Sequence, residues 1–269
     1  MVGSTKDMAK RMRLKALEMA YNSGSYGSHL GGGLSTIEIF ATLYNDVLNV
    51  DVQNPTDTQR DRLIVSKGHC VLAYYTALYE KGFLSDNDLE QFEKNGYHWH
   101  GHAMRSLNYG VEFSGGSLSM GMSFAVGEAI ACKAKGLGNQ VFVIVGDGEC
   151  DEGLIWEAAL AAAHYKLDNL TIIVDRNGLQ YDGQTDQVLS TSSLASKFSA
   201  FGFHVDEVDG HDCEQLALVL SSKRTMPHCV IANTIKGKGV SFMENDKVWH
   251  HHTLNEVQYI QAREEVENA

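Results

Sequence analysis

The feature that most constrains this chain is a strand–helix–strand segment in its second half. Gln140–Val145 is an apolar run typical of a buried strand, and Leu170–Val174 is a second. Between them, Gly153–Lys166 is rich in alanine and has helical spacing. Two parallel strands joined by a helix end at the same edge of their sheet. Ligands of open α/β sheets bind at that edge.

Polar residues follow both strands and suit a hard cation. Asp147 follows the first run and Asn177 the second, about thirty positions later. Mg²⁺ takes about six oxygens at roughly 2.1 Å, only a few of them from protein. We therefore expect the Asp147 carboxylate, the Asn177 amide oxygen and the Leu179 carbonyl to hold Mg²⁺ (or Ca²⁺ or Mn²⁺) on a diphosphate. Gly148 would let the backbone approach phosphate. The alternative is an Asp that only caps a turn.

The rest of the chain alternates helical and apolar segments, which predicts an α/β fold: a doubly wound, mostly parallel sheet with helices on both faces. No linker or repeat divides the sequence, so we expect a single domain over 1–269. The predicted strands are Arg62–Val65, Phe203–Val208 and His228–Ile235. The predicted helices are Asp7–Tyr21, a segment from a Ser35–Glu38 capping box to Leu48, Cys70–Lys81, Ser117–Lys135, Cys213–Lys223 and a last helix capped by Thr253–Glu256.

Composition excludes several classes of partner. A net charge of −12 argues against nucleic-acid and anionic-membrane surfaces, but not against a small anion in a local pocket. No apolar run has the length of a membrane span, and no signal-peptide core is present at the N-terminus. Five scattered cysteines without a Cys-x-x-Cys pair indicate reduced, mostly buried thiols and a cytoplasmic location. We expect Cys150, beside Asp147, to be structural.

Four histidines lie in glycine-rich turns: His29, His69, His102 and His250. Imidazoles in such turns can bind diphosphate oxygens or move protons to and from substrate hydroxyls near pH 7. Taken singly, each is more often a surface or core residue; with the metal motif, site residues are the better interpretation. Zinc bound by His98, His100 and His102 or by His250–His252 is a rival hypothesis that nothing else in the sequence favours. We expect His251 and His252 to lie on the surface.

The metal motif and its flanks, Glu152–Ala158 and Asp175–Gly183, resemble transketolase, and the resemblance runs from about Met8 to the last helix. It implies thiamine diphosphate as cofactor. His69 and His250 would contact the diphosphate, while His29 and His102 would face the sugar; we expect His29, His102 and His250 to be catalytic. The loop Glu112–Gly121 would line the thiamine through Gly116 and Leu118.

The resemblance also assigns weaker positions. Glu152 matches a glutamate at the contact between cofactor-binding halves, whereas Glu157 is explained by the helix dipole. Lys236–Gly239 resembles a loop next to the diphosphate, although a solvated turn is nearly as good an interpretation. Three positions depart from the long form of the family: Leu30 and Ser117 replace prolines, and Lys67 replaces an asparagine.

In transketolases a pyrimidine-binding domain normally follows the domain that this chain resembles. The sequence ends at Ala269 with nothing like it, so we expect the N-terminal subunit of a split transketolase, paired with a pyrimidine-domain chain as α2β2. Such an enzyme would move a two-carbon ketol unit, held as a dihydroxyethyl carbanion, from a ketose phosphate to an aldose phosphate. Open alternatives are a decarboxylating enzyme similar to deoxyxylulose-phosphate synthase, a transketolase for a modified or branched sugar, and a non-catalytic scaffold.

Overall fold

The computed structural model describes residues 3–269 and contains one five-stranded sheet in the order β1-β2-β3-β5-β4. All neighbouring strands are parallel. The strands are β1 (Arg62–Val65), β2 (Val141–Gly146), β3 (Leu170–Arg176), β4 (His204–Asp209) and β5 (His228–Asn233). Because Gly146 of β2 pairs with Asp175 of β3, the residues that follow these two strands emerge side by side at one edge.

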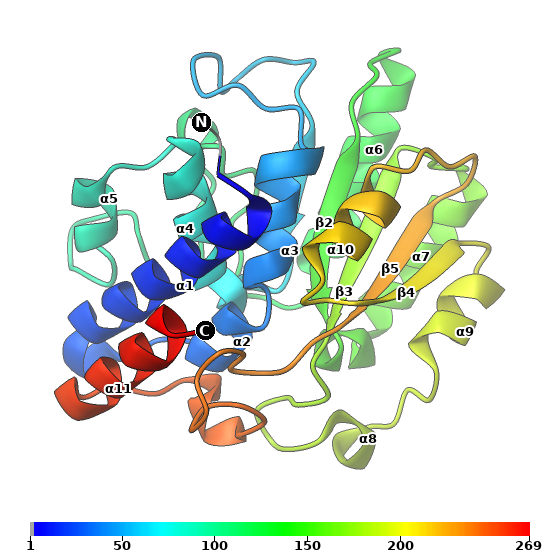
Figure 1. Ribbon diagram of the computed structural model, residues 1–269. Helices are drawn as coiled ribbons and strands as arrows, with labels where there is room; N and C mark the ends of the chain where they lie inside the picture. Colours follow the sequence, from blue (N-terminus) through cyan, green and yellow to red (C-terminus); the bar gives the residue numbers. More distant parts are fainter. Residues whose placement is uncertain (1–2) are drawn as a thin grey trace.

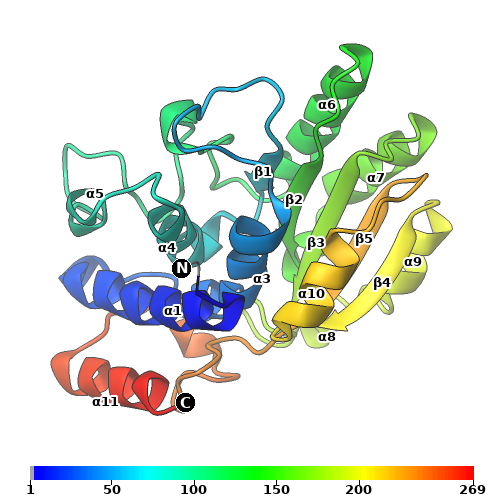
Figure 2. The ribbon, with the colours of Figure 1, turned by 45° about the horizontal axis from the view of Figure 1, so that its top comes forward.

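Helices cover both faces of the sheet (Figures 1 and 2). The bounds are α1 (Thr5–Asn22), α2 (Leu30–Leu34), α3 (Ile37–Thr42), α4 (Val71–Lys81), α5 (Asp86–Glu90), α6 (Met120–Ala134), α7 (Gly153–His164), α8 (Thr185–Val188), α9 (Leu194–Ala200), α10 (Cys213–Leu220) and α11 (Glu256–Glu267). Among the described residues, no helix combines the length and apolarity needed to cross a bilayer.

Alternate side chains of each strand enter two separate cores, as the period of a strand requires. In β2, Phe142 and Ile144 pack with α1, α3, α4 and α10, whereas Val141, Val143 and Val145 pack with α6, α7 and α9. The predicted doubly wound α/β fold is therefore confirmed. All five cysteines are buried and unpaired.

The Ser35–Glu38 capping box is a wrong prediction. Ser35 follows α2 directly, and its hydroxyl donates to Asp175 Oδ2 (2.8 Å) and to the Gly32 carbonyl (3.1 Å). Glu38 pairs with Arg13 (2.6 Å) and His211 (2.9 Å) instead of returning to the helix start. No capping box forms because the Ser35 and Glu38 side chains both bind partners that are distant in sequence. At its other end, α3 is followed by a π-helical turn at Leu43–Val47.

Two other predicted helix starts are too early. The last helix is capped by Asn255, whose side chain accepts from the Gln258 N–H (2.9 Å) while Gln258 accepts from the Asn255 N–H (3.2 Å). Helix α6 begins at Met120 and not at Ser117, because Ser119 has a left-handed backbone (φ 69°).

We predict that Asn255→Ala lowers the free energy of unfolding by about 1 kcal/mol, since it removes a capping side chain. The matched control Thr253→Ala should stay within about 0.5 kcal/mol of the parent, because Thr253 is an exposed residue outside the helix. Urea unfolding of the two variants measures both values. A larger loss for Thr253→Ala would restore the cap predicted from the sequence.

Candidate functional site

A cavity of about 320 Å³ opens at the carboxyl ends of the central strands. Its lining includes side chains or backbone from the segments after β1, β2 and β3 and from the loop before α11; these residues are His29, Lys67, His69, His102, Gly116, Leu118, Gly146, Asp147, Gly148, Glu149, Asn177, Leu179, Gln180, Tyr181, Asp182 and His250. Most of the site residues predicted from the sequence therefore share one cavity.

Asp147 lies at the end of β2 and is only 6% exposed. Its two carboxylate oxygens accept from the Gly148 N–H (2.9 Å) and the Gly178 N–H (2.6 Å). No side-chain donor reaches this carboxylate within residues 3–269. Burial, together with the neighbouring Asp175 charge, raises the pKa of Asp147 to about 6. A cation placed here would compensate a carboxylate that lacks a counter-charge.

Asn177 and Leu179 belong to the turn after β3, beside Asp147. The Asn177 amide donates to Asp175 Oδ2 (2.9 Å), which fixes the side chain, and its oxygen accepts from the Leu179 N–H (3.1 Å). The positive φ of Gly178 (75°) turns the chain so that its own N–H meets Asp147. The turn thus collects carboxylate, amide and carbonyl oxygens, the ligand types that Mg²⁺ prefers.

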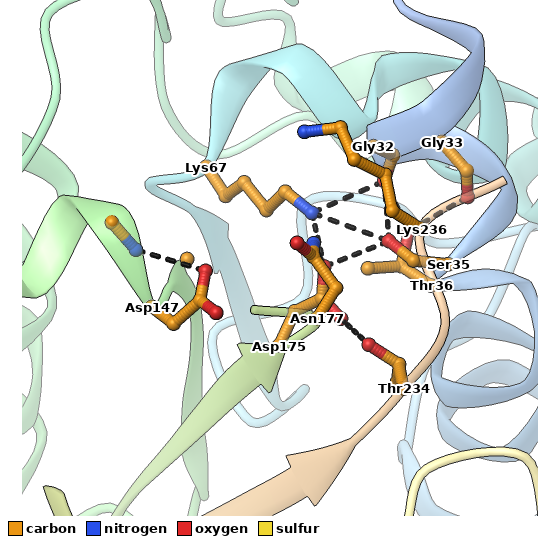
Figure 3. A network of polar contacts seen from close by, with 12 residues as sticks. Gly32, Gly33, Ser35, Thr36, Lys67, Asp147, Asp175, Asn177, Thr234 and Lys236 are labelled. Carbon is orange, nitrogen blue, oxygen red and sulfur yellow. Dashed lines mark hydrogen bonds and ion pairs between the residues drawn. The ribbon is translucent and has the colours of Figure 1, made fainter. Parts of the chain in front are cut away.

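A buried ion pair lies beneath this turn (Figure 3). Lys67 is 1% exposed, Asp175 is fully buried, and the Lys67 ammonium contacts Asp175 Oδ2. The same oxygen accepts from Ser35 and Asn177, and the other carboxylate oxygen accepts from Thr234. Burial alone would raise the pKa of Asp175, but the Lys67 charge and these hydrogen bonds hold it below its ordinary value. The pair ties the segment after β1 to β3 and so supports Asn177.

Glu149 joins the other side of the cavity. Its carboxylate accepts from the Gly146 N–H (2.9 Å), the Ser119 N–H (2.6 Å) and the Ser66 hydroxyl. Burial raises the pKa of Glu149. Because Ser119 is the N-cap of α6, Glu149 fixes the loop that carries Gly116 and Leu118 against the end of β2.

Four imidazoles gather at the mouth of the cavity, those of His29, His69, His102 and His250, and the exposed His251 ring packs beside them. The His29 ring lies 6.0 Å from His69, 5.2 Å from His102, 5.7 Å from His250 and 4.6 Å from His251, centroid to centroid. Burial lowers the pKa of His29 to about 3 and that of His250 to about 4; burial also lowers the pKa values of His69 and His102. The four are thus neutral near pH 7 and can each donate and accept a hydrogen bond.

Lys236 connects the histidines to the turn after β3. Its ammonium donates to the Leu179 carbonyl (2.9 Å) and to His250 Nδ1 (3.1 Å). Burial, together with the charge of Lys67, lowers the pKa of Lys236 to about 8. One buried ammonium group, that of Lys67, therefore lines the cavity of a strongly acidic chain, and a second, that of Lys236, contacts two residues of its lining.

Glycines give the cavity its depth. A Cβ on Gly68 would approach His102 Cδ2 to 2.8 Å and the Gly116 nitrogen to 3.0 Å; one on Gly32 would approach His69 Cδ2 to 2.7 Å. Larger residues at these positions would displace the histidine rings. Leu118, 39% exposed, supplies an apolar wall.

Glu152 lies apart from the other predicted site residues. It is exposed at the N-cap of α7 and does not line the cavity, because the 3₁₀ turn Gly148–Asp151 carries the chain away from the end of β2. His251 and His252 are exposed as predicted, although the His251 ring packs against His29. Of the described residues, the group suited to a zinc-type ion is His204, Asp206 and His228, and not the histidines considered from the sequence.

Sequence reasoning missed Asp175, Glu149 and the contacts of Lys236, and noted Lys67 only as a departure. The sequence did contain a sign of these residues, because charged residues inside or directly after apolar strands are buried and rarely left unpaired. No local pattern could match the partners, since Lys67 and Asp175 are 108 positions apart.

We predict that Lys67→Met lowers the free energy of unfolding by about 3–5 kcal/mol, because it leaves the Asp175 carboxylate buried without a counter-charge. The double variant Lys67→Met/Asp175→Asn should lose far less than the two single variants add up to. Urea unfolding of the four proteins completes the cycle. Additive losses, or a loss below about 1 kcal/mol for Lys67→Met, would contradict the ion-pair assignment.

Comparison with known proteins bears on this site. Residues 4–267 match the family described as transketolase, thiamine diphosphate binding domain. One subunit of an apulose-4-phosphate transketolase, from Actinobacillus succinogenes, is 43% identical over 90% of this chain and 88% of its own length. A 6-deoxy-6-sulfo-D-fructose transketolase subunit of Clostridium is 39% identical over 89% of this chain and 88% of its own.

Solved transketolase structures have the same fold as this chain. The transketolase of Leishmania mexicana superposes with a TM-score of 0.91 at 28% identity, covering 99% of this chain, which spans 42% of that longer protein. The family match extends over nearly the whole chain, and it includes the strand ends that carry Asp147 and Asn177. The chain therefore belongs to the family of transketolase thiamine-diphosphate-binding domains.

Proposed function

We propose that this chain is the N-terminal, diphosphate-binding subunit of a split transketolase that transfers a two-carbon ketol unit from a ketose phosphate to an aldose phosphate. The observation that carries the proposal is the joining of the Asp147–Asn177–Leu179 oxygens and four neutral histidines in one cavity. The chain also matches named transketolase subunits over nearly their full length.

The residues fit thiamine diphosphate with a divalent metal ion. Asp147 is a buried carboxylate contacted only by backbone N–H groups among residues 3–269. His29 Nδ1 is buried without a partner in the same part of the chain and is free to bind a polar ligand group. Asp147, Asn177 and Leu179 would hold Mg²⁺ (or Ca²⁺ or Mn²⁺), while Gly148 and His69 would contact the diphosphate and Gly116 and Leu118 the rings.

Residues in and around the cavity would have different roles in the reaction. Bound thiamine diphosphate supplies the carbanion chemistry that allows a ketol unit to leave one sugar and join another. Neutral His29, His102 and His250 would orient the substrate hydroxyls and move protons to and from them. Lys236, which already donates to His250 Nδ1, would fix the tautomer of that ring with its proton on Nε2. Leu118 and the buried walls would limit access of water.

The relatives support a second chain in the assembly. Both are named as subunits of transketolases, and each is covered almost completely by this chain. We infer a partner that carries the pyrimidine-binding domain, with α2β2 as the proposed stoichiometry. Glu152, exposed at the N-cap of α7, would lie at the contact with that partner.

The sugar class has two candidates. The two relatives are named for apulose 4-phosphate and for 6-deoxy-6-sulfo-D-fructose, the second of which is a modified sugar by its name. A specialised sugar is therefore the second candidate beside the ordinary ketose and aldose phosphates. Decarboxylation, which would suit a smaller 2-oxo acid, gains no support from a four-histidine mouth suited to hydroxyl groups.

We predict that Asp147→Ala abolishes Mg²⁺-dependent binding of thiamine diphosphate, because a metal ligand is lost. The fold should survive, because the substitution removes a buried charge and leaves no new one. Isothermal titration with and without Mg²⁺, with the partner chain present, measures the binding; circular dichroism checks the fold. Glu157→Ala, exposed on α7 and outside the cavity, is the control and should bind as the parent does. Unchanged binding by Asp147→Ala would refute the metal assignment.

The reaction itself is tested with the purified chain, its pyrimidine-domain partner, thiamine diphosphate and Mg²⁺. We expect the ketose phosphate to be shortened by two carbons and the aldose phosphate to be lengthened by two. Neither product should form when either chain is omitted. The donor panel should include branched and sulfonated sugars. Release of carbon dioxide from pyruvate without ketol transfer would favour the decarboxylating alternative. Failure to bind the cofactor at all would favour a scaffold.

A further inference from the structure

A second polar cluster lies at the opposite end of the sheet, on its edge strand. His204 begins β4, Asp206 follows two residues later, and His228 begins β5, where it pairs in register with His204. Residues two apart on a strand share a face, so all three side chains lie on the face of Val208, which packs in the core that contains α10. Figure 2 shows β4 at the outer edge of the sheet beside β5.

Their ligand atoms converge. Asp206 Oδ2 lies 2.9 Å from His228 Nε2 and 3.4 Å from His204 Nε2, and the three atoms all lie within 4.8 Å of one another. Ligands of a tetrahedral Zn²⁺ at about 2.0–2.1 Å are roughly 3.3 Å apart. The group thus needs an adjustment of no more than about 1.5 Å. His204 and Asp206 are partly exposed, which gives an ion and a completing water a way in.

Arg224 competes for the same carboxylate. It belongs to the loop between α10 and β5, and its guanidinium lies 3.1 Å from the same Asp206 Oδ2. Its Nε is buried without a partner within residues 3–269, so the arginine is incompletely satisfied where it lies. One carboxylate oxygen is therefore shared by three nitrogen groups, and a divalent ion could replace the most weakly satisfied of them.

We propose that His204, Asp206 and His228 form a binding site for a divalent transition-metal ion, with Arg224 as the cation that the metal displaces. Two imidazoles and one carboxylate suit Zn²⁺, Ni²⁺ or Cu²⁺ better than Mg²⁺ or Ca²⁺, which prefer oxygen ligands. The ion would cross-link the edge strand β4 to β5. The site is independent of the proposed function.

The alternative is a purely structural cluster in which Asp206 accepts hydrogen bonds and no ion is bound. The two hypotheses give different outcomes for Arg224→Gln. A metal site loses its competing cation and binds more tightly, whereas a structural cluster only loses an ion pair.

The experiment titrates the whole chain, stripped with EDTA and dialysed, with Zn²⁺ and separately with Mg²⁺, against a chromophoric chelator. Histidines of the cofactor cavity contribute the same background to every variant. We expect one zinc ion more for the parent than for His204→Asn, an affinity loss of at least about tenfold for Asp206→Asn, and a gain of several-fold for Arg224→Gln. His164→Asn, exposed on α7, is the control and should match the parent.

A second readout keeps the test independent of folding defects. Zn²⁺ should raise the Tm of the parent but raise that of His204→Asn less, and Mg²⁺ should raise neither through this site. His204 is the main variant because it is partly exposed, whereas His228 is 3% exposed at its side chain. Equal zinc stoichiometry in the parent and His204→Asn, or unchanged affinity in Arg224→Gln, would overturn the proposal.

Discussion

The buried ion pair between Lys67 and Asp175 is the interaction on which the cavity depends. It connects the segment after β1 with the end of β3, and hydrogen bonds to Ser35 and Thr234 add the segments after α2 and β5. Asn177 is fixed by the same carboxylate. Buried pairs stabilise little relative to apolar replacements but are costly to break. The ion pair matters mainly for geometry, because Asp175 holds the Asn177 side chain and so orients the oxygens of the turn after β3.

Charge in this protein is organised locally. The chain carries a net charge of −12, yet Lys67 and Lys236 are buried beside the cavity and four imidazoles surround its mouth. Such a pocket would suit the proposed diphosphate, whereas the net charge argues against nucleic-acid and anionic-membrane surfaces. The Asp147 carboxylate, which only backbone N–H groups contact within residues 3–269, lines the same cavity, an arrangement suited to a metal ion bound together with an anion. Global composition could not reveal this arrangement.

The sheet and the meeting of Asp147 with Asn177 were predictable because both follow from local rules: apolar runs form the strands, and a parallel crossover returns them to one edge. The helix starts were less predictable, since Ser35 and Glu38 bind distant partners and Asn255 replaces Thr253 as cap. The supports of the site could not be predicted for the same reason. Glu149 binds Ser66, 83 positions away, and the pairing of His204 with His228 depends on strand register.

We propose that this cavity is one half of a thiamine-diphosphate site that a second chain completes. Native mass spectrometry of the tagged chain, isolated from its own cells in Mg²⁺ buffer, tests it most directly. We expect equal numbers of this chain and a partner of the pyrimidine-binding type, with thiamine diphosphate and a divalent ion retained in the complex. A homo-oligomer that holds neither cofactor nor partner, even after both are added back, would contradict it.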